Sequence, residues 1–212
     1  MASGVFITDN RLSFSQVLAS ELRDKGVKVC LSSEVKEDGE SSSTEIEWNR
    51  SSLFSLQSLM VQLKNIDLDA ETSIIVFDAQ DYTKLYPSLD ATSIDKNIGD
   101  LISSNLALSM MLKNYYIKKA RGRLLFVFRG IETPSGYPCI SAAASAFVRI
   151  AEETVDFIRK AEVPGVQTLL VKLEGFDDEN FAKWIANQLD LAVLSKSVGR
   201  WVKAGQRGFF GK

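Results

Sequence analysis

Short apolar runs alternate along the chain with longer stretches in which apolar residues recur every three or four positions. The short runs are continuous and rich in β-branched and aromatic residues, as in strands that are buried on both faces of a parallel sheet. They lie at residues 5–7, 27–31, 46–48, 73–77, 124–128, 166–173 and 200–203. The pattern therefore predicts about seven strands.

The longer stretches have the apolar spacing of amphipathic helices. They cover residues 16–25, 51–64, 95–119, 141–160 and 180–191. Strands and helices in alternation imply parallel pairing through right-handed crossovers, with helices on both faces. We therefore predict a doubly wound, mostly parallel sheet, which is a Rossmann-like α/β fold. The chain has 212 residues and no linker-like segment, so residues 1–212 are expected to form a single domain.

Composition removes several classes of function. A formal net charge of −2 gives no reason to expect nucleic acid or an anionic membrane as a partner. No apolar run approaches the roughly 20 residues of a membrane helix, and the N-terminus lacks the features of a signal peptide. The two cysteines, Cys30 and Cys139, have no metal-ligand spacing and suggest a reducing compartment. A cytoplasmic protein is expected, in which Cys139 is a buried, small apolar side chain.

The absence of histidine restricts the chemistry further. It excludes a Ser-His-Asp or Cys-His nucleophile, a histidine-ligated metal and an imidazole proton shuttle. Two cysteines are also too few for a four-cysteine zinc site. No metal is expected, and any general acid or base must be a carboxylate, Lys, Tyr or Cys.

The segment TDNRLSFSQ, residues 8–16, follows the first predicted strand and leads into the first helix. A dinucleotide-binding turn would be rich in glycine here, but this one contains none. Asp9, Asn10 and Ser13 fit N-cap and turn positions instead. Arg11 could pair with a phosphate, but a solvated arginine is expected.

Four segments together carry a resemblance to a known family. VFITDNRLSFSQVLASELRDKGVKVCL has the order strand, turn, helix, strand; WNRSSLFSLQSLM follows the third strand; GRLLFVF and ISAAASAFVRIAEETV supply a later strand and helix. In order and spacing they resemble the short-chain dehydrogenase/reductase family over nearly the whole chain. The resemblance implies a Rossmann-like sheet, a nicotinamide dinucleotide as cofactor, and carbonyl reduction or alcohol oxidation by a Ser, a Tyr and a Lys.

The residues at the family's cofactor positions differ from its pattern. The family has Thr-Gly, three residues, Gly, an apolar residue and Gly; here Thr8 matches, and the glycine places hold Asp9, Ser13 and Ser15. Side chains there fill the space that a pyrophosphate needs, and Asp9 brings a like charge towards it. Glu34 is the nearest candidate for the acidic residue that binds the ribose, but it begins a charged loop and is expected to be solvated. No cofactor is therefore expected.

The catalytic positions differ as well. The serine place falls on or near Arg129, and the tyrosine and lysine places fall on Ile140 and Ala144. Neither Ile nor Ala can transfer a proton. The leading hypothesis is a catalytically inactive short-chain-dehydrogenase-like protein that acts as a binding, regulatory or dimer-partner module. Two alternatives are an NAD(P)-dependent oxidoreductase with a rearranged site that uses Tyr137, Arg129 or Asp78, and a small-molecule sensor.

Two further features suggest contacts with other proteins. Members of the family commonly dimerise through two long helices, which correspond to residues 95–119 and 141–160. We expect a homo-oligomer or a homologous subunit at these helices. The tail, residues 196–212, is basic and aromatic, a composition that also fits nucleic acid or an anionic surface. We expect instead that Trp201 lies in the core and that Phe209 and Phe210 pack on protein.

Overall fold

The computed structural model describes residues 4–34, 44–65, 70–130, 136–194 and 199–205. Within them, one sheet has the strand order β3-β2-β1-β4-β5-β6-β7, and every neighbouring pair is parallel. The strands are β1 (Gly4–Ile7), β2 (Val29–Ser33), β3 (Glu45–Glu47), β4 (Ala70–Asp78), β5 (Gly122–Arg129), β6 (Val166–Lys172) and β7 (Trp201–Lys203). The prediction of a doubly wound parallel sheet of about seven strands is confirmed.

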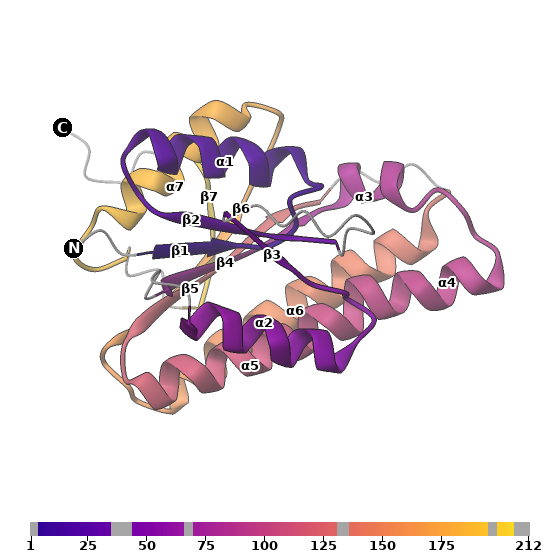
Figure 1. The fold of residues 1–212 in the computed structure, drawn as a ribbon. Helices are drawn as coiled ribbons and strands as arrows, with labels where there is room; N and C mark the ends of the chain where they lie inside the picture. Colours follow the sequence, from indigo (N-terminus) through magenta and orange to yellow (C-terminus); the bar gives the residue numbers. More distant parts are fainter. Residues whose placement is uncertain (1–3, 35–43, 66–69, 131–135, 195–198, 206–212) are drawn as a thin grey trace.

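Helices cover both faces of the sheet. They are α1 (Ser13–Asp24), α2 (Leu53–Asn65), α3 (Ala79–Leu85), α4 (Ala91–Ile98), the π-helical turn η1 (Gly99–Ser103), α5 (Ser104–Lys119), α6 (Pro138–Lys160) and α7 (Asp178–Leu189). Helices α1 and α7 lie on one face, and α2, α5 and α6 lie on the other (Figure 1). The chain order reverses between β1 and β4, and open α/β sheets bind their ligands at such a point, beyond the carboxyl ends of the strands.

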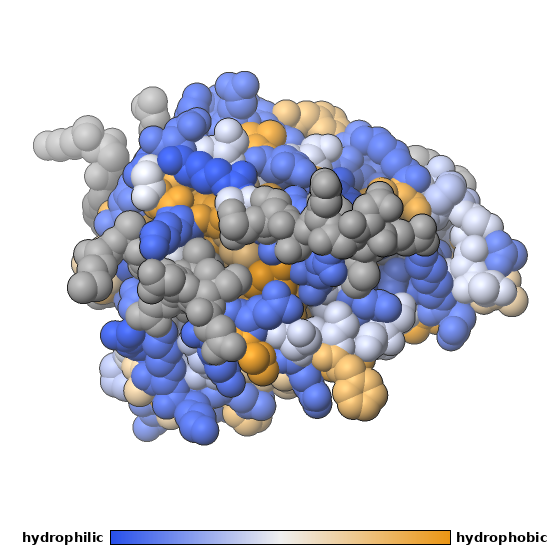
Figure 2. Space-filling view, in the orientation of Figure 1, coloured by the Kyte–Doolittle hydropathy of each residue, from blue (hydrophilic) through white to orange (hydrophobic). Residues whose placement is uncertain are grey.

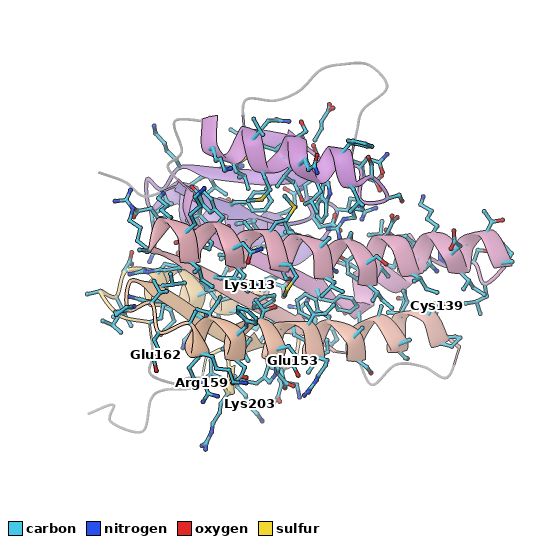
Figure 3. All side chains as sticks on the ribbon, turned by 90° about the horizontal axis from the view of Figure 1, so that it is seen from below. Lys113, Cys139, Glu153, Arg159, Glu162 and Lys203 are labelled. Atoms are coloured by element: carbon cyan, nitrogen blue, oxygen red, sulfur yellow. The ribbon has the colours of Figure 1, made fainter. Side chains whose placement is uncertain are left out.

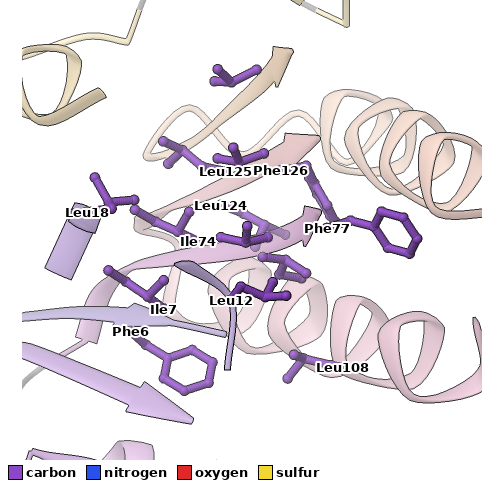
Figure 4. Close-up of a cluster of buried hydrophobic side chains, with 14 of the residues drawn as sticks. Phe6, Ile7, Leu12, Leu18, Ile74, Phe77, Leu108, Leu124, Leu125 and Phe126 are labelled. Carbon is purple, nitrogen blue, oxygen red and sulfur yellow. The ribbon is translucent and has the colours of Figure 1, made fainter. Parts of the chain in front are cut away.

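The interior consists of side chains from both faces of the central strands (Figure 4). Phe6 of β1, Ile74 of β4 and Leu125 of β5 are fully buried. These strands are continuous apolar runs because neither face meets water. The face shown in Figure 2 is largely hydrophilic, with its apolar residues in small separate patches. Among the described helices, none combines the length and the apolar character needed to cross a bilayer.

Several element boundaries differ from the prediction. Strand β2 runs two residues later, and α1 begins three residues earlier, at Ser13. The predicted helix 95–119 begins at Ala91 and contains the π-helical turn η1. Helix α3 was not predicted at all. It forms because the Asp78 carboxylate accepts hydrogen bonds from its first backbone N–H groups, at 3.0 Å from Gln80 N and 3.3 Å from Asp81 N.

Trp201 lies at the border of the core rather than within it. It is half-buried, its ring centroid is 5.8 Å from that of Phe128, and its Nε1 donates to Glu152 Oε1 at 3.0 Å. The prediction of a core position is therefore wrong in degree, because the indole N–H finds its acceptor near the surface. The predicted contacts of Phe209 and Phe210 lie outside the described residues.

Candidate functional site at the ends of β1 and β4

The turn after β1 places an acidic side chain in the interior. Asp9 has a φ of 62° and is 3% exposed. This left-handed conformation favours glycine, and Asp tolerates it better than most residues. The Asp9 N–H donates to Ser32 Oγ at 2.8 Å. Asp9 is therefore a turn residue, as predicted, but the N-cap position of α1 is held by Leu12, so the expected N-cap role of Asp9, Asn10 or Ser13 is wrong.

Thr8 and Ser15 have structural partners in this turn. Thr8 Oγ1 accepts a hydrogen bond from the Val76 N–H of β4 at 2.9 Å, and Ser15 Oγ donates to the Thr8 carbonyl oxygen at 2.9 Å. Both side chains are fully buried. They therefore fix the turn to β4 and to the first turn of α1.

Two arginines and a tyrosine surround the Asp9 carboxylate. Arg11 donates to it through Nε at 2.7 Å and through Nη2 at 2.9 Å, and the Tyr82 hydroxyl donates at 3.0 Å. Arg50 Nη2 lies 3.1 Å from Oδ2, and the Arg50 side chain is 4% exposed. Burial alone would raise the pKa of Asp9, but Arg50 and Arg11 outweigh it and hold the pKa below the ordinary 3.8. The prediction of a solvated Arg11 is wrong.

The cluster continues from Arg11 to the π-helical turn. Arg11 Nη2 donates to the Tyr86 hydroxyl at 3.2 Å, which donates to Asp100 Oδ2 at 3.1 Å. Burial raises the pKa of Tyr86 to about 12. Arg11 Nη1 also contacts Glu34. Glu34 is 56% exposed in its side chain, so it is an ion-pair partner as well as a solvated residue. Arg50 Nη1 donates to the Asp100 carbonyl oxygen at 3.2 Å.

A second carboxylate lies at the N-terminus of α1. Asp81 Oδ2 accepts a hydrogen bond from the Ser13 N–H at 2.7 Å, and Asp81 Oδ1 accepts one from Lys84 Nζ at 2.9 Å. Burial would raise the pKa of Asp81, but the hydrogen bonds from Lys84 and Ser13 lower it below 3.8. The positive end of the α1 dipole is thus already matched by an anion from the same chain. Sequence reasoning misses Asp81, because the apolar pattern predicts no helix at α3, which carries it.

Arg129 ends β5 and is buried between two aspartates. Its Nη1 lies 3.0 Å from Asp78 Oδ2, and its Nη2 contacts Asp178 at the start of α7. Burial raises the pKa of Asp78 above 3.8, and Arg129 opposes this rise only in part. The sequence singled out Arg129 and Asp78 as separate candidates, and the structure joins them in one ion pair.

The residues at the predicted tyrosine and lysine places lie on α6. Ile140 is 1% exposed and belongs to the core, and Ala144 is half-buried against it. Tyr137 precedes the helix, is half-buried and accepts the Ser141 N–H at its carbonyl oxygen at 3.0 Å. Cys139, predicted to be buried, is half-exposed at the first turn of α6, while Cys30 is buried; both are free thiols.

The arrangement at the carboxyl edge pairs its buried charges internally. Asp9 is paired with Arg11 and Arg50, and Asp78 is paired with Arg129. Within the described residues, no group of three or more Cys, Asp or Glu side chains is placed to hold a metal ion. These buried ion pairs join the ends of β1, β4 and β5 to the segments that carry their partners.

A protein of Treponema pallidum (strain Nichols), described as an uncharacterized protein, is 46% identical to this chain. The alignment of 214 residues covers 100% of this chain and 97% of that protein. The two proteins belong to one family. No protein-family model matches the chain.

Two solved structures resemble this one over nearly their whole length. A short-chain dehydrogenase from Streptomyces avermitilis has a TM-score of 0.70 and 10% sequence identity, covering 96% of this chain and 89% of that one. A short-chain dehydrogenase from Bacillus anthracis str. 'Ames Ancestor' has a TM-score of 0.73 and 13% identity, covering 95% of each chain. The fold of this protein is that of the short-chain dehydrogenases. The resemblance predicted from the sequence is confirmed at the level of the fold.

Proposed function

We propose that this protein is a non-catalytic member of the short-chain-dehydrogenase fold, which binds no dinucleotide and serves as a binding or regulatory module. One observation carries the proposal: the Asp81 carboxylate caps the first turn of α1 through the Ser13 N–H, at 2.7 Å. In a Rossmann-like fold, the pyrophosphate of a dinucleotide takes this place at the helix N-terminus. A dinucleotide would have to displace one buried anion and approach a second, Asp9.

Moving Asp9 as well would be costly, because this carboxylate belongs to a larger buried network. Asp9 is held by Arg11, Arg50 and Tyr82, and moving it would leave the buried Arg50 guanidinium without its carboxylate. Breaking a buried ion pair by removing one partner typically costs about 3–5 kcal/mol. A ligand would have to supply that free energy before it gained any affinity.

The residues at the catalytic places support the same proposal. Ile140 and Ala144 carry no group that can donate or accept a proton at a carbonyl oxygen. An oxidoreductase with a rearranged site would have to use Tyr137, Arg129 or Asp78. Since Arg129 and Asp78 already pair with each other at 3.0 Å, the non-catalytic role is favoured.

The test is thermal unfolding with NAD⁺, NADH, NADP⁺ and NADPH, together with an assay of turnover at the reduced-nicotinamide absorbance band. A ligand at a hundred times its Kd stabilises a protein by about 2.7 kcal/mol, which is a rise in Tm of roughly 5–11 °C for a chain of this size. We expect no shift and no turnover. A shift in Tm of several degrees, or turnover that is lost in Tyr137→Phe, would support the alternative function of an oxidoreductase with a rearranged site.

For the assembly of this protein, we propose self-association, or pairing with a homologous subunit, through α4, α5 and α6. In Figure 3, α5 and α6 lie side by side, and α4 continues the line of α5. Ile98 of α4 and Leu106 of α5 are each 45% exposed. The outer side of α6 carries ion pairs within the helix, such as Arg149 with Glu153. We therefore propose that the apolar contact forms on α4 and the first half of α5.

Light scattering after size exclusion tests the assembly. We expect a dimer whose interface buries at least roughly 1,200 Å² in total, and we expect Ile98→Asp and Leu106→Asp to produce monomers. Phe54→Asp on α2, where the side chain is 83% exposed, is the matched control and should leave the dimer intact. A wild-type monomer at high concentration would contradict self-association. If only Phe54→Asp gave a monomer, the interface would lie on α2 and the proposal would be wrong.

A further inference from the structure

A cavity of about 760 Å³ lies where β5 and β6 end and the chain turns towards α7. It is lined by residues 128–130 and 172–176. Sites for small molecules usually measure about 300–1,000 Å³. The cavity is therefore of a size to hold one small organic molecule.

Part of the lining is apolar. Leu173 is 2% exposed, and the Phe128 ring packs between those of Phe77 and Trp201, with centroids at 6.0 and 5.8 Å. The Phe176 side chain, by contrast, is 72% exposed. A fixed apolar wall beside an exposed aromatic ring favours a ligand with an apolar body, because such a ligand would remove the Phe176 ring from water.

Arg129 supplies a buried positive charge beside this wall. Its two terminal nitrogens contact Asp78 and Asp178, but its Nε is buried and has no hydrogen-bond acceptor among the described residues. Arg129 is 5% exposed and borders the cavity. Because Nε has almost no exposed surface, a ligand in the cavity does not reach it, and Arg129 acts on a ligand through the positive charge of its guanidinium.

Two lysines place further positive charge at the same end of the sheet. Lys172 borders the cavity, and its Nζ lies 3.7 Å from Glu174; Lys203 of β7 lies 2.8 Å from the same carboxylate. Two ammonium groups thus share one carboxylate. Their side chains are about half-exposed, at 46% and 51%, so Lys172 is free to reorient towards an anion.

We infer that this cavity binds a small organic anion, a monocarboxylate or sulfonate with an aromatic or aliphatic body. The acid group faces the Lys172 ammonium beside the Arg129 guanidinium, and the apolar body lies against Phe128, Leu173 and Phe176. The inference rests on the proposed binding role and names the class of ligand that this role requires.

The probe is 8-anilinonaphthalene-1-sulfonate, an apolar sulfonate whose fluorescence rises in apolar surroundings. We expect saturable binding of one probe per chain and its displacement by benzoate. Benzyl alcohol has a similar body without the charge and should displace the probe far less well. Binding without saturation, or equal displacement by benzyl alcohol, would overturn the inference.

Exposed residues of the cavity supply variants that should fold. Lys172→Gln and Phe176→Ser should each weaken the probe's affinity about tenfold, the effect of one lost charged or aromatic contact. Matched controls are Lys183→Gln on α7, where the side chain is 55% exposed, and Phe54→Ser on α2, where the residue is 83% exposed. Equal affinities in all four variants would place the probe elsewhere and overturn the inference.

Arg129→Gln and a dinucleotide titration complete the experiment. Arg129→Gln should weaken displacement by benzoate, because it removes the positive charge beside the cavity. Circular dichroism checks the fold of this variant, since the substitution also leaves Asp78 and Asp178 without their partner. NADH added to the same titration separates the two claims. Displacement of the probe by micromolar NADH would contradict the proposed function, whereas the preference for benzoate over benzyl alcohol tests the anion site alone.

Discussion

Replacing Asp9 with asparagine removes one negative charge from the interior and keeps the shape of the side chain. Asparagine also tolerates the left-handed backbone that Asp9 adopts at a φ of 62°. What changes is the electrostatic balance, because Arg50, 4% exposed in its side chain, and Arg11 both lose their buried carboxylate partner. We expect the free energy of unfolding to fall by about 3–5 kcal/mol, which lowers the Tm by roughly 6–20 °C for a chain of this length.

Urea unfolding of the wild type, Asp9→Asn and a surface control measures this loss. Asp190→Asn is the control, because Asp190 pairs with Lys25 at 3.1 Å and is 64% exposed in its side chain; we expect a change of about 0–1 kcal/mol there. In a double-mutant cycle, Arg50→Met should lower the free energy of unfolding much less in the Asp9→Asn background than in the wild type. The coupling energy between Asp9 and Arg50 should be about 0.5–3 kcal/mol. A loss in Asp9→Asn no larger than in Asp190→Asn would refute the reasoning.

The pH dependence gives the same experiment a second readout. The pKa of Asp9 is lowered below 3.8 in the folded protein, so its contribution is fully present above the unfolded value and is lost as pH falls through the folded value. The difference between the wild type and Asp9→Asn should therefore stay constant from about pH 5 to 8 and shrink only in acid below 3.8. A difference that already vanished at neutral pH would show that the charge of Asp9 is not its source.

Three further predictions concern other parts of the fold. Asp81→Ala should destabilise the protein by about 0.5–2 kcal/mol, as the loss of a helix cap does, and by more than Asp81→Asn, which keeps an acceptor oxygen; equal losses in chemical denaturation would contradict the cap. Gly165→Ala should lower the free energy of unfolding by about 1–3 kcal/mol, because the new Cβ would lie 2.2 Å from the Ala120 carbonyl oxygen. A Cβ on the helical Gly99 meets nothing within 4 Å, so Gly99→Ala should raise the free energy of unfolding by about 0.5–1 kcal/mol. A more stable Gly165→Ala than Gly99→Ala would contradict the packing. Burial raises the pKa of the Cys30 thiol to about 12, so Ellman's reagent should titrate only the half-exposed Cys139 in the native protein and both thiols after unfolding; two fast thiols would contradict the burial of Cys30.

The sheet could be predicted because its strands are buried on both faces. A run such as SIIVF, residues 73–77, leaves little choice beyond a buried strand, and the alternation of strands with helices then fixes parallel pairing. Helix α3 was missed because it has only seven residues and depends on a cap from Asp78, which a pattern of apolar positions does not reveal.

The buried cluster could be predicted only in part. Asp9 stood out because it occupies a place where glycine is expected, but its partners Arg50 and Tyr82 come from segments 41 and 73 positions further along the chain. Arg11 was expected to be solvated because its local sequence contains no feature that buries it. The Asp81 carboxylate at α1 could not be foreseen, since it reaches the helix from the end of another strand.

Fluorescence titration of the protein with NADH and NADPH tests the central claim most directly, because it observes the nicotinamide itself and needs no substrate. The account predicts that emission and anisotropy stay those of the free dinucleotide up to about 1 mM protein, a concentration that would reveal binding as weak as roughly −4 kcal/mol. A saturable change in emission or anisotropy with a micromolar Kd would contradict the account. It would show that a diphosphate binds at the N-terminus of α1 despite the Asp9 and Asp81 carboxylates.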